Sequence, residues 1–383
     1  MVIAGGGTGG HLYPGIAVAR ELLERQPDAV VSFAGTAHGI EARVVPREGF
    51  PLDLIRSAGL KGKSWGDRAR GALLVPLGLI DANGIVTARR PQLVIGVGGY
   101  SSGPVVLAAA LRGVPTMLLE QNAAPGLTNR LLRPFVRAAA VSFESARRFF
   151  GAKAFVSGNP VRPEFLRAGP LRESGANDDA SGVGILVFGG SQGAHAINLA
   201  MVEAAAQLAR GGDRFRLAHQ TGERDVEMVR AAYRQAGLQA EVEPFFYDMG
   251  RRLHAADLIV CRAGATTLAE ITAAGKPAIL IPLPTATDDH QRRNAEALAS
   301  AGAAEMLRQS EATGGVLAQR IVALLRDHAG RDYRGGEAGD SHSPADGDRR
   351  PPAAQRGGAG VCRRCRDAAA VGRQRFGIGA ADG

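Results

Sequence analysis

The strongest constraint on the fold of this chain is a pattern that occurs twice along its 383 residues. Short runs of β-branched and other apolar residues alternate with segments whose apolar residues recur at helical spacing, which is typical of parallel sheets with crossover helices. The polar stretch 168–182 interrupts the alternation, which then begins again. The sequence therefore predicts an α/β protein with two doubly wound, Rossmann-like domains of similar size that face each other across a cleft.

The predicted elements also set the expected domain bounds. An N-terminal domain is expected over residues 1–157 and a C-terminal domain over 164–330, with an interdomain link at 158–163. The first helix is expected at 15–26, because Pro27 ends the helical pattern. The predicted strands are 2–4, 29–34, 51–55, 92–97, 115–119, 138–142 and 153–156 in the first half, and 184–189, 214–219, 239–243, 257–261, 277–281 and 303–306 in the second.

The last segment, residues 331–383, differs in kind from the rest of the chain. Gly, Ala, Arg, Asp and Pro dominate it, and such a segment cannot bury enough apolar surface to offset the entropy lost on ordering. We therefore expect a disordered tail, whose composition also resembles GC-rich coding sequence read out of frame. The pair Cys362 and Cys365 lacks further ligands nearby and is not expected to bind zinc.

The overall charge indicates which classes of ligand to expect. A formal net charge of +9 favours an anionic partner, such as a phosphorylated ligand or an anionic membrane surface. Nucleic acid is not expected, because aromatic residues make up only 5% of the chain and do not interleave with a basic run. The longest apolar run, 72–80, is shorter than the roughly 18 residues of a membrane span. With no leader and three cysteines, we expect a cytosolic protein.

Three glycine-rich turns that follow predicted strands are the first indication of a ligand site. In an open α/β sheet, ligands bind beyond the carboxyl ends of the strands, where backbone N–H groups and helix N-termini can hold phosphates. Because both halves of the chain contain such turns, they indicate a shared phosphate-binding cleft. The turns are GGGTGGH at 5–11, GVGGYSSGP at 96–104 and GGSQGA at 189–194.

The first turn also has the G-x-G-x-x-G spacing of dinucleotide sites, in Gly5, Gly7 and Gly10. A dinucleotide site needs an acidic residue at the end of the next strand to bind the ribose hydroxyls. That strand ends at Thr36 without one, and the nearest acid beyond it is Glu41. An NAD-dependent oxidoreductase is therefore disfavoured.

Two residues near these turns each have two interpretations. His11 follows the first turn directly, and it is either a helix-entry histidine satisfied by the backbone or a general base at the mouth of the cleft. Glu270 has capping-box spacing from Thr267, yet it also lies where a carboxylate could accept both hydroxyls of a nucleotide ribose. Spacing alone leaves both questions open.

Several segments taken together closely resemble the MurG family of bacterial glycosyltransferases, which add GlcNAc to lipid I in peptidoglycan synthesis. The resemblance runs in the family's order over residues 2–326. LEQNAAPGLTNR and HQRRNA argue against a related transferase that acts on another lipid, such as diacylglycerol. The resemblance is carried by AGGGTGGHLYPGIAVA, GVGGYSSGPVVLAA, LEQNAAPGLTNR, SGNPVRPEF, FGGSQGA and CRAGATTLAEITAAGKPAILIPLPTATDDHQRRNA.

The resemblance implies a GT-B fold with the active site in the cleft between the domains. Lipid I would bind the first domain at the membrane, and the donor UDP-GlcNAc would bind mainly to the second. The C4 hydroxyl of MurNAc would attack the anomeric carbon of GlcNAc with inversion as UDP departs, giving lipid II. Helix N-termini and an arginine can stabilise the leaving diphosphate. No cofactor and no metal are expected, because the D-x-D string at Asp346 and Asp348 lies in the tail.

The resemblance also implies roles for individual residues. His11 matches the family's candidate base, and Glu120 lies near enough in the motifs to share the task. Phe246 would lie against uracil, and Gln291 would bind GlcNAc hydroxyls. The residues expected to approach the acceptor diphosphate are Gly7, Gly9, Gly10, Gly98, Gly99, Tyr100 and Ser101. The expected donor-binding residues are Thr8, Gly9, Gly10, Asn122, Arg162, Ser191, Gln192, Phe246, Ala265, Thr266, Glu270, His290 and Gln291.

The segment 59–90 indicates how the chain meets the membrane. It has more apolar residues than one face of a crossover helix needs, and lysines and arginines flank them. The resemblance places the family's membrane patch here, at the cytoplasmic side of the cell membrane, with other cell-wall synthesis proteins as further partners. A nucleotide-sugar-binding protein without turnover remains an alternative, because the chain after Asp327 lacks the pattern of the family's returning helix. The residues expected to dock peripherally on anionic lipid are Leu73, Leu74, Leu77 and Ile80.

Overall fold

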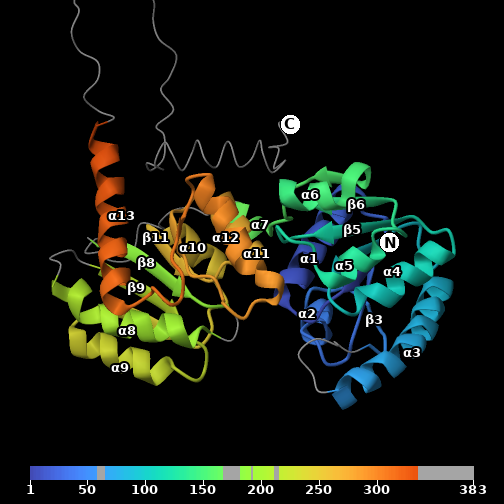
Figure 1. The fold of residues 1–383 in the computed structure, drawn as a ribbon, viewed down its shortest axis with the longest axis horizontal. Coiled ribbons are helices and arrows are strands. Elements are labelled where there is room, and N and C mark those ends of the chain that lie inside the picture. Colours follow the sequence, from blue (N-terminus) through green and yellow to red (C-terminus); the bar gives the residue numbers. More distant parts are fainter. Residues whose placement is uncertain (58–64, 167–181, 191–192, 211–214, 335–383) are drawn as a thin grey trace, which may run out of the picture.

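A computed structural model describes residues 1–57, 65–166, 182–190, 193–210 and 215–334. These residues form two sheets that lie side by side, each packed against helices (Figure 1). The first sheet has seven strands in the order β3-β2-β1-β4-β5-β6-β7, and the second has six in the order β10-β9-β8-β11-β12-β13. Neighbouring strands pair in parallel in both sheets. The prediction of two doubly wound α/β domains is thus confirmed.

Every strand predicted from the sequence is present, with small differences at the ends. Strands of the first sheet are β1 (Val2–Gly5), β2 (Ser32–Gly35), β3 (Leu52–Leu54), β4 (Val94–Gly98), β5 (Thr116–Glu120), β6 (Ala138–Val141) and β7 (Ala154–Val156). Those of the second are β8 (Val183–Phe188), β9 (Phe215–Gln220), β10 (Gln239–Glu243), β11 (Leu258–Cys261), β12 (Ala278–Leu280) and β13 (Glu305–Met306).

The helices connect and cover these strands. In the first half they are α1 (Gly9–Arg25), α2 (Glu41–Arg47), α3 (Trp65–Arg89), α4 (Ser102–Leu111), α5 (Leu127–Leu132) and α6 (Glu144–Phe150). In the second they are α7 (Pro163–Leu166), α8 (His195–Arg210), α9 (Val226–Ala236), α10 (Met249–Ala255), α11 (Ala265–Ala274), α12 (His290–Ser300) and α13 (Gly314–Arg334).

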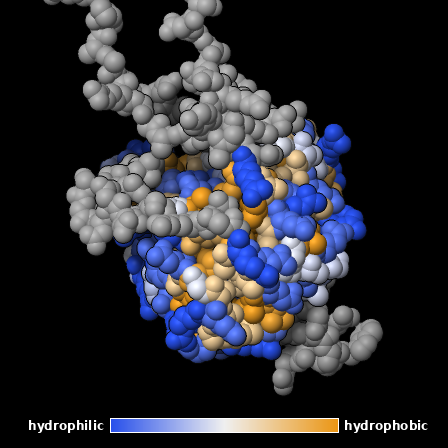
Figure 2. Space-filling model, turned by 90° about the vertical axis from the view of Figure 1, so that its left-hand side faces the viewer, coloured by the Kyte–Doolittle hydropathy of each residue, from blue (hydrophilic) through white to orange (hydrophobic). Residues whose placement is uncertain are grey.

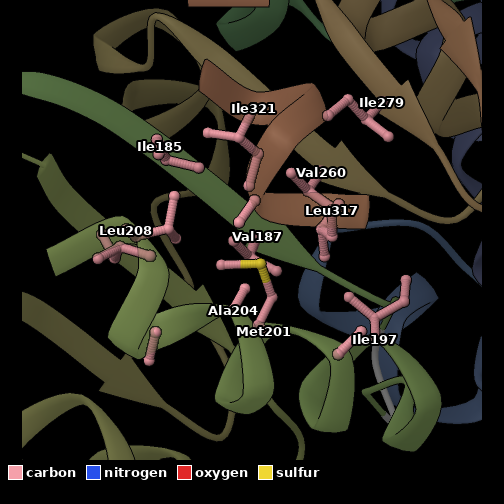
Figure 3. Packing of buried hydrophobic residues seen from close by; sticks show 14 of the residues in the cluster. Ile185, Val187, Ile197, Met201, Ala204, Leu208, Val260, Ile279, Leu317 and Ile321 are labelled. Atoms are coloured by element: carbon pink, nitrogen blue, oxygen red, sulfur yellow. The ribbon is translucent and has the colours of Figure 1, made fainter. Parts of the chain in front are cut away.

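Alternation along the central strands builds a core on each face of the sheets. In β8, Ile185 and Val187 point to one face and Leu186 and Phe188 to the other, as the period of a strand requires. The first pair packs with α8 and α13 through residues such as Met201 and Leu317 (Figure 3). The outer end of this domain, where α8, α9 and α13 lie, shows apolar residues among polar ones (Figure 2).

The strand order brings two of the glycine turns together. It reverses between β1 and β4, so the turns that follow these two strands leave the same edge of the sheet. Gly5 at the end of β1 pairs directly with Gly98 at the end of β4. This reversal is the position where open α/β sheets bind ligands.

Two predicted boundaries are wrong. The first helix begins at Gly9, not at residue 15, because the last two glycines of the first turn form its opening. Pro14 therefore lies inside α1, and because proline has no N–H, the Gly10 carbonyl loses its helical partner. The predicted tail begins too early, because α13 continues to Arg334, and residues 335–383 lie outside the described residues.

Candidate active site

The site lies where loops of the two domains meet, and hydrogen bonds cross between them. The Thr266 hydroxyl donates to the Gly10 carbonyl at 3.1 Å, so a residue of the second domain replaces the bond that Pro14 removes. α1 and α11 lie side by side at this junction (Figure 1). The structure thus brings together Gly10 and Thr266, which the sequence assigned to one donor site.

A second set of bonds joins the loop after β5 to α12. The Ala123 N–H donates to Asn294 Oδ1 at 2.9 Å, and Asn294 Nδ2 donates to Asn122 Oδ1 at 3.2 Å. The same amide reaches the Ala263 carbonyl at 3.3 Å, at the start of the loop that leads into α11. The fully buried Asn294 therefore fixes Asn122 relative to the donor side.

The first glycine turn is held by an internal carboxylate. The Gly7 N–H donates to Glu41 Oε2 at 2.8 Å, and Glu41 is fully buried. Glu41 is the acid nearest to the end of β2. Its carboxylate binds the first glycine turn and is therefore not available for a ribose. The N–H groups of Gly9 and Gly10 lie in the first turn of α1, where a helix has no internal acceptors for them.

His11 is the third residue of α1, and its side chain packs against the second glycine turn, which follows β4. Its Nδ1 lies 3.1 Å from the Thr8 hydroxyl, and its ring is so close to Gly98 that a Cβ there would lie 2.8 Å from His11 Cδ2. The pKa of the partly buried ring is lowered from 6.5 to about 4, chiefly by burial and also by the charge of His290, while the Gly6 backbone opposes the shift. The ring is neutral at pH 7 and can accept a proton.

The second turn backs onto the first and then opens α4. Gly98 and Gly99 have φ of +95° and +78°, and a Cβ at Gly99 would lie 2.5 Å from the Gly6 carbonyl oxygen. The adjoining Ser101 is fully buried, and its hydroxyl has no hydrogen-bond partner among the described residues. The ring of Tyr100 lies beside Gly7.

Glu120 organises the loop that follows β5. Its buried carboxylate accepts hydrogen bonds from Asn122 N, Asn122 Nδ2, Gly126 N and Asn129 Nδ2. Burial raises the pKa of Glu120, and these hydrogen bonds oppose the rise. Among the described residues, the hydrogen bonds of Glu120 are to the loop that follows β5, and none of them is to His11.

Two residues expected in the donor site, Arg162 and Glu270, are in direct contact. Arg162 Nη2 donates to Glu270 Oε1 at 3.0 Å, and burial raises the pKa of Glu270 while the charge of Arg162 opposes it. The Arg162 guanidinium also lies between the rings of Tyr13, at 4.4 Å, and Phe165, at 4.6 Å. Arg162 therefore links the carboxylate of Glu270 to α1 of the other domain.

The capping-box interpretation of Glu270 is wrong. The residue that caps α11 is Gly264, whose φ of −67° and ψ of 140° are extended, and this described helix has no side-chain cap. Thr267 lies inside the helix, three positions beyond the cap. Glu270 is therefore turned to Arg162 and not to the helix N-terminus.

Other expected donor residues are already engaged with the protein. Gln291 Oε1 accepts from the N–H groups of Ala263 at 3.3 Å and Leu283 at 3.0 Å. The Phe246 ring is buried under the Arg252 guanidinium, 3.7 Å from its centroid. The N–H of Phe246 donates to Gln220 Oε1.

Gln220 was not predicted, and it connects two donor loops. Its Oε1 accepts from Phe246 N at 2.9 Å, and its Nε2 donates to the Gly190 carbonyl at 2.8 Å. Gly190 belongs to the third glycine turn, in which Ser191 and Gln192 lie outside the described residues. Asn294 was missed too, although it lies three and four positions after Gln291 and His290 on one helix, a spacing that faces one side.

The expected membrane residues fall partly within the described structure. The side chains of Leu73 and Leu74 lie outside it, whereas Leu77 is 36% exposed and Ile80 63% exposed on α3. No helix among the described residues is long and apolar enough to span a bilayer. No cluster of three His, Cys, Asp or Glu side chains in those residues could hold a metal ion.

Two parallel-sheet domains with a polar site between their facing loops form the GT-B architecture. Residues 1–141 match the glycosyltransferase family 28 N-terminal domain and residues 184–335 match its C-terminal domain. The chain belongs to glycosyltransferase family 28.

Curated relatives share about half of their residues with this chain. One from Myxococcus xanthus is 50% identical over 332 residues, covering 86% of this chain and 85% of the relative. One from Geobacter sulfurreducens is 49% identical over 330 residues, covering 86% and 90%. Both are named UDP-N-acetylglucosamine–N-acetylmuramyl-(pentapeptide) pyrophosphoryl-undecaprenol N-acetylglucosamine transferase.

Solved structures agree with the fold. The crystal structure of Acinetobacter baumannii MurG has a TM-score of 0.66 and 33% identity, and the match covers 84% of this chain and 89% of that one. A glycosyltransferase of kitacinnamycin has a TM-score of 0.64 at 16% identity, over 98% of this chain and 94% of that one, which bears on the fold alone.

Proposed function

We propose that this chain transfers GlcNAc from UDP-GlcNAc to the C4 hydroxyl of MurNAc in lipid I, with inversion, and so forms lipid II. Relatives named for this activity support it, and alignments cover 85% and 91% of the length of two of them. The observation that carries the proposal is the neutral His11 at the junction of the first glycine turn with the donor domain. A neutral imidazole there can receive the proton of an attacking hydroxyl.

The reaction would proceed by a single displacement. The O4–C1 bond forms as the bond between C1 and the diphosphate oxygen breaks, and UDP leaves with the electron pair. The O4 proton passes to the imidazole of His11. The positive charge of Arg162 and the N-terminus of α11, which includes Ala265 and Thr266, stabilise the charge that develops on UDP.

The donor would lie along the loops of the second domain. Glu270 would accept the ribose hydroxyls, sharing its carboxylate with Arg162. His290 and Gln291 at the start of α12 would lie near the GlcNAc ring, together with Asn122 from across the cleft. Ser191 and Gln192 would meet the diphosphate.

The acceptor diphosphate would lie against the first two glycine turns. The N–H groups of Gly9 and Gly10, at the start of α1, and the buried Ser101, at the start of α4, support this position. Gly98 and Gly99 allow the backbone to come close. Gly7 would support the turn, since its own N–H is bonded to Glu41.

The membrane surface would extend beyond α3. Leu127 and Leu131, one helical turn apart on α5, are 54% and 65% exposed, and Leu111 at the end of α4 is 72% exposed. α4 packs against both α3 and α5. Arg130, Arg133 and Arg137 supply cations nearby, each of which contributes on the order of 1 kcal/mol at an anionic surface.

A transfer assay tests this proposal. The purified chain is incubated with labelled UDP-GlcNAc and a lipid I analogue, with and without EDTA. The expected result is acceptor-dependent transfer that EDTA leaves unchanged. Binding of UDP-GlcNAc without turnover would contradict the proposal and favour a nucleotide-sugar-binding protein.

A further inference from the structure

Tyr13 of α1 is a half-buried aromatic residue that touches both sides of the site. Its ring packs against Gly9, four positions earlier on the same helix, where a Cβ would lie 3.0 Å from Tyr13 Cε2. The centroid of the same ring lies 4.4 Å from the guanidinium carbon of Arg162, which directly precedes α7. One side chain therefore contacts both the first glycine turn and the arginine of the donor side.

Two carboxylates and two rings surround the guanidinium of Arg162. Nη2 donates to Glu270 Oε1 at 3.0 Å, and Nη1 lies 3.2 Å from Glu164 Oε1. Nε is buried and has no hydrogen-bond partner among the described residues, so hydrogen bonds alone do not fix the group. The rings of Tyr13 and Phe165 supply further contacts, at 4.4 Å and 4.6 Å from the guanidinium carbon.

Carboxylates and aromatic rings hold a cation in different ways. A carboxylate neutralises the cation and competes with a phosphate for the same N–H groups. The face of a ring attracts the cation through its quadrupole and leaves the charge in place. The planar guanidinium of arginine stacks well on such a face. A guanidinium that is held by rings therefore keeps its attraction for an anionic ligand.

The two rings belong to different domains. Phe165 of α7 is fully buried in a core cluster of the second domain, so that domain fixes its position. Tyr13 belongs to the first domain, where α1 packs against α11, the helix that contains Glu270 (Figure 1). The ring of Tyr13 therefore connects Arg162 to the acceptor domain.

We propose that Tyr13 is a positioning residue for the donor, and that it acts by holding the guanidinium of Arg162 toward the diphosphate of UDP-GlcNAc. The acceptor domain thereby completes the donor site. This role rests on the proposed function, in which Arg162 stabilises the charge that develops on UDP. Donor affinity should then depend on a side chain of the acceptor domain.

The first test compares Tyr13→Leu with Tyr13→Phe. Leucine keeps apolar volume against Gly9 and removes the ring face, whereas phenylalanine keeps the ring and removes only the hydroxyl. Without the ring, the donor has to order the arginine side chain on binding, so the Kd for UDP should rise about fivefold in Tyr13→Leu. Tyr13→Phe should restore the affinity of the parent chain. Calorimetric titration measures both, and an unchanged Kd in Tyr13→Leu would overturn the inference.

Steady-state kinetics give a readout that a purely structural role would not move. In Tyr13→Leu the KM for UDP-GlcNAc should rise about fivefold, while the KM for a lipid I analogue stays near that of the parent chain. A loosened α1 would instead disturb Gly9 and Gly10 at its start and affect both substrates. Equal increases in the two KM values would therefore contradict the positioning role.

A double-mutant cycle shows whether Tyr13 acts through Arg162. Arg162→Met removes the charge and keeps a long side chain, so it should itself weaken UDP binding. In that background Tyr13→Leu should change the Kd for UDP little, because the group that it positions is gone. Additive losses, or UDP binding by Arg162→Met at the affinity of the parent chain, would overturn the inference.

UDP binding also separates this role from the proposed reaction. A parent chain that binds UDP but transfers no GlcNAc would overturn the proposed reaction, whereas the cycle would still show whether Tyr13 positions Arg162. If Tyr13→Leu is unfolded at the temperature of the assay, Tyr13→Met in the same cycle gives the same distinction.

Discussion

The two domains hold their substrate loops with different chemistry. On the acceptor side, buried carboxylates do so: Glu41 binds the first glycine turn and Glu120 binds the loop after β5. On the donor side, the neutral amides of Gln220 and Gln291 connect the loops, and Asn294 joins this side to the acceptor side. Hydrogen bonds to charged groups contribute about 1.5–3 kcal/mol and neutral ones about 0.5–1.5 kcal/mol. The comparison teaches that a bond lost beneath an acceptor loop should cost more stability than one of these amide bonds lost on the donor side.

The largest expected effect separates chemistry on the acceptor side from binding on the donor side. His11→Ala removes the group that receives the proton, so kcat should fall by about 100-fold or more. The donor contacts lie mainly on the other domain, so the Kd for UDP-GlcNAc should change little. Steady-state kinetics and calorimetry check the two values, and a normal kcat would remove the base assignment.

Next in size is the loss of the charged pair on the donor side. Glu270→Ala should weaken UDP binding by about 1.5–3 kcal/mol, the range for a hydrogen bond with a charged group. Thr267→Ala is the matched control, because Thr267 does not cap α11 and its loss should leave UDP affinity unchanged. Calorimetric titration with UDP measures both, and an unchanged affinity in Glu270→Ala would contradict the ribose role.

The third prediction concerns the amide that joins the two sides. Asn294→Ala leaves the Ala123 N–H and the Ala263 carbonyl without their partner, so the free energy of unfolding should fall by about 1–3 kcal/mol. Asn83→Ala, which removes an exposed hydrogen bond to Arg112, should cost under about 0.5 kcal/mol. Urea denaturation compares them. If both variants lose the same free energy of unfolding, the hydrogen bonds of Asn294 between the domains stabilise the fold no more than an exposed bond does.

Acid should act on one histidine with a lowered pKa in each domain. Burial lowers the pKa of His219 from 6.5 to about 3 and that of His11 to about 4. The unfolded chain therefore binds these protons first, and stability falls as the pH drops below 6.5, with the loss continuing down to the folded values. Between pH 7 and pH 5, His219→Gln should lose on the order of 1–2 kcal/mol less than the parent chain. Denaturation curves at both pH values measure this, and equal losses would contradict it.

The smallest effect is expected at the membrane surface. Ile80→Ser should weaken binding to vesicles that contain anionic lipid by about fivefold, the equivalent of roughly 1 kcal/mol of apolar burial. Met228→Ser, on the exposed face of α9 in the other domain, is the control and should have no effect. Co-sedimentation with vesicles measures both. Equal binding by all three proteins would place the membrane contact elsewhere.

Most of the fold could be predicted because it depends on local pattern. Parallel strands buried on both faces appear as short apolar runs, and all thirteen were located from these runs. The start of α1 could not be predicted, because two glycines and Pro14 argue against a helix there. A hydrogen bond from Thr266, 256 residues away, satisfies the carbonyl that Pro14 leaves free.

The sequence could indicate only those site residues that lie within the recognised motifs. The motifs named both Arg162 and Glu270 as donor residues, but they did not indicate that the two form an ion pair with each other. The support beneath the site was not predictable, since Glu41 meets Gly7 across 34 residues and Asn294 meets Ala123 across 171. Such contacts follow from strand order, which spacing within a motif does not contain.

The pH dependence of kcat/KM for a lipid I analogue, measured for the parent chain and for His11→Ala, tests the central claim most directly. kcat/KM reports the ionisation of the free enzyme. Because burial sets the pKa of His11 at about 4, transfer should be constant near neutral pH and fall only as the pH approaches that value. The acid limb should be absent from the residual activity of His11→Ala. An identical limb in both proteins would contradict the assignment of His11 as the base.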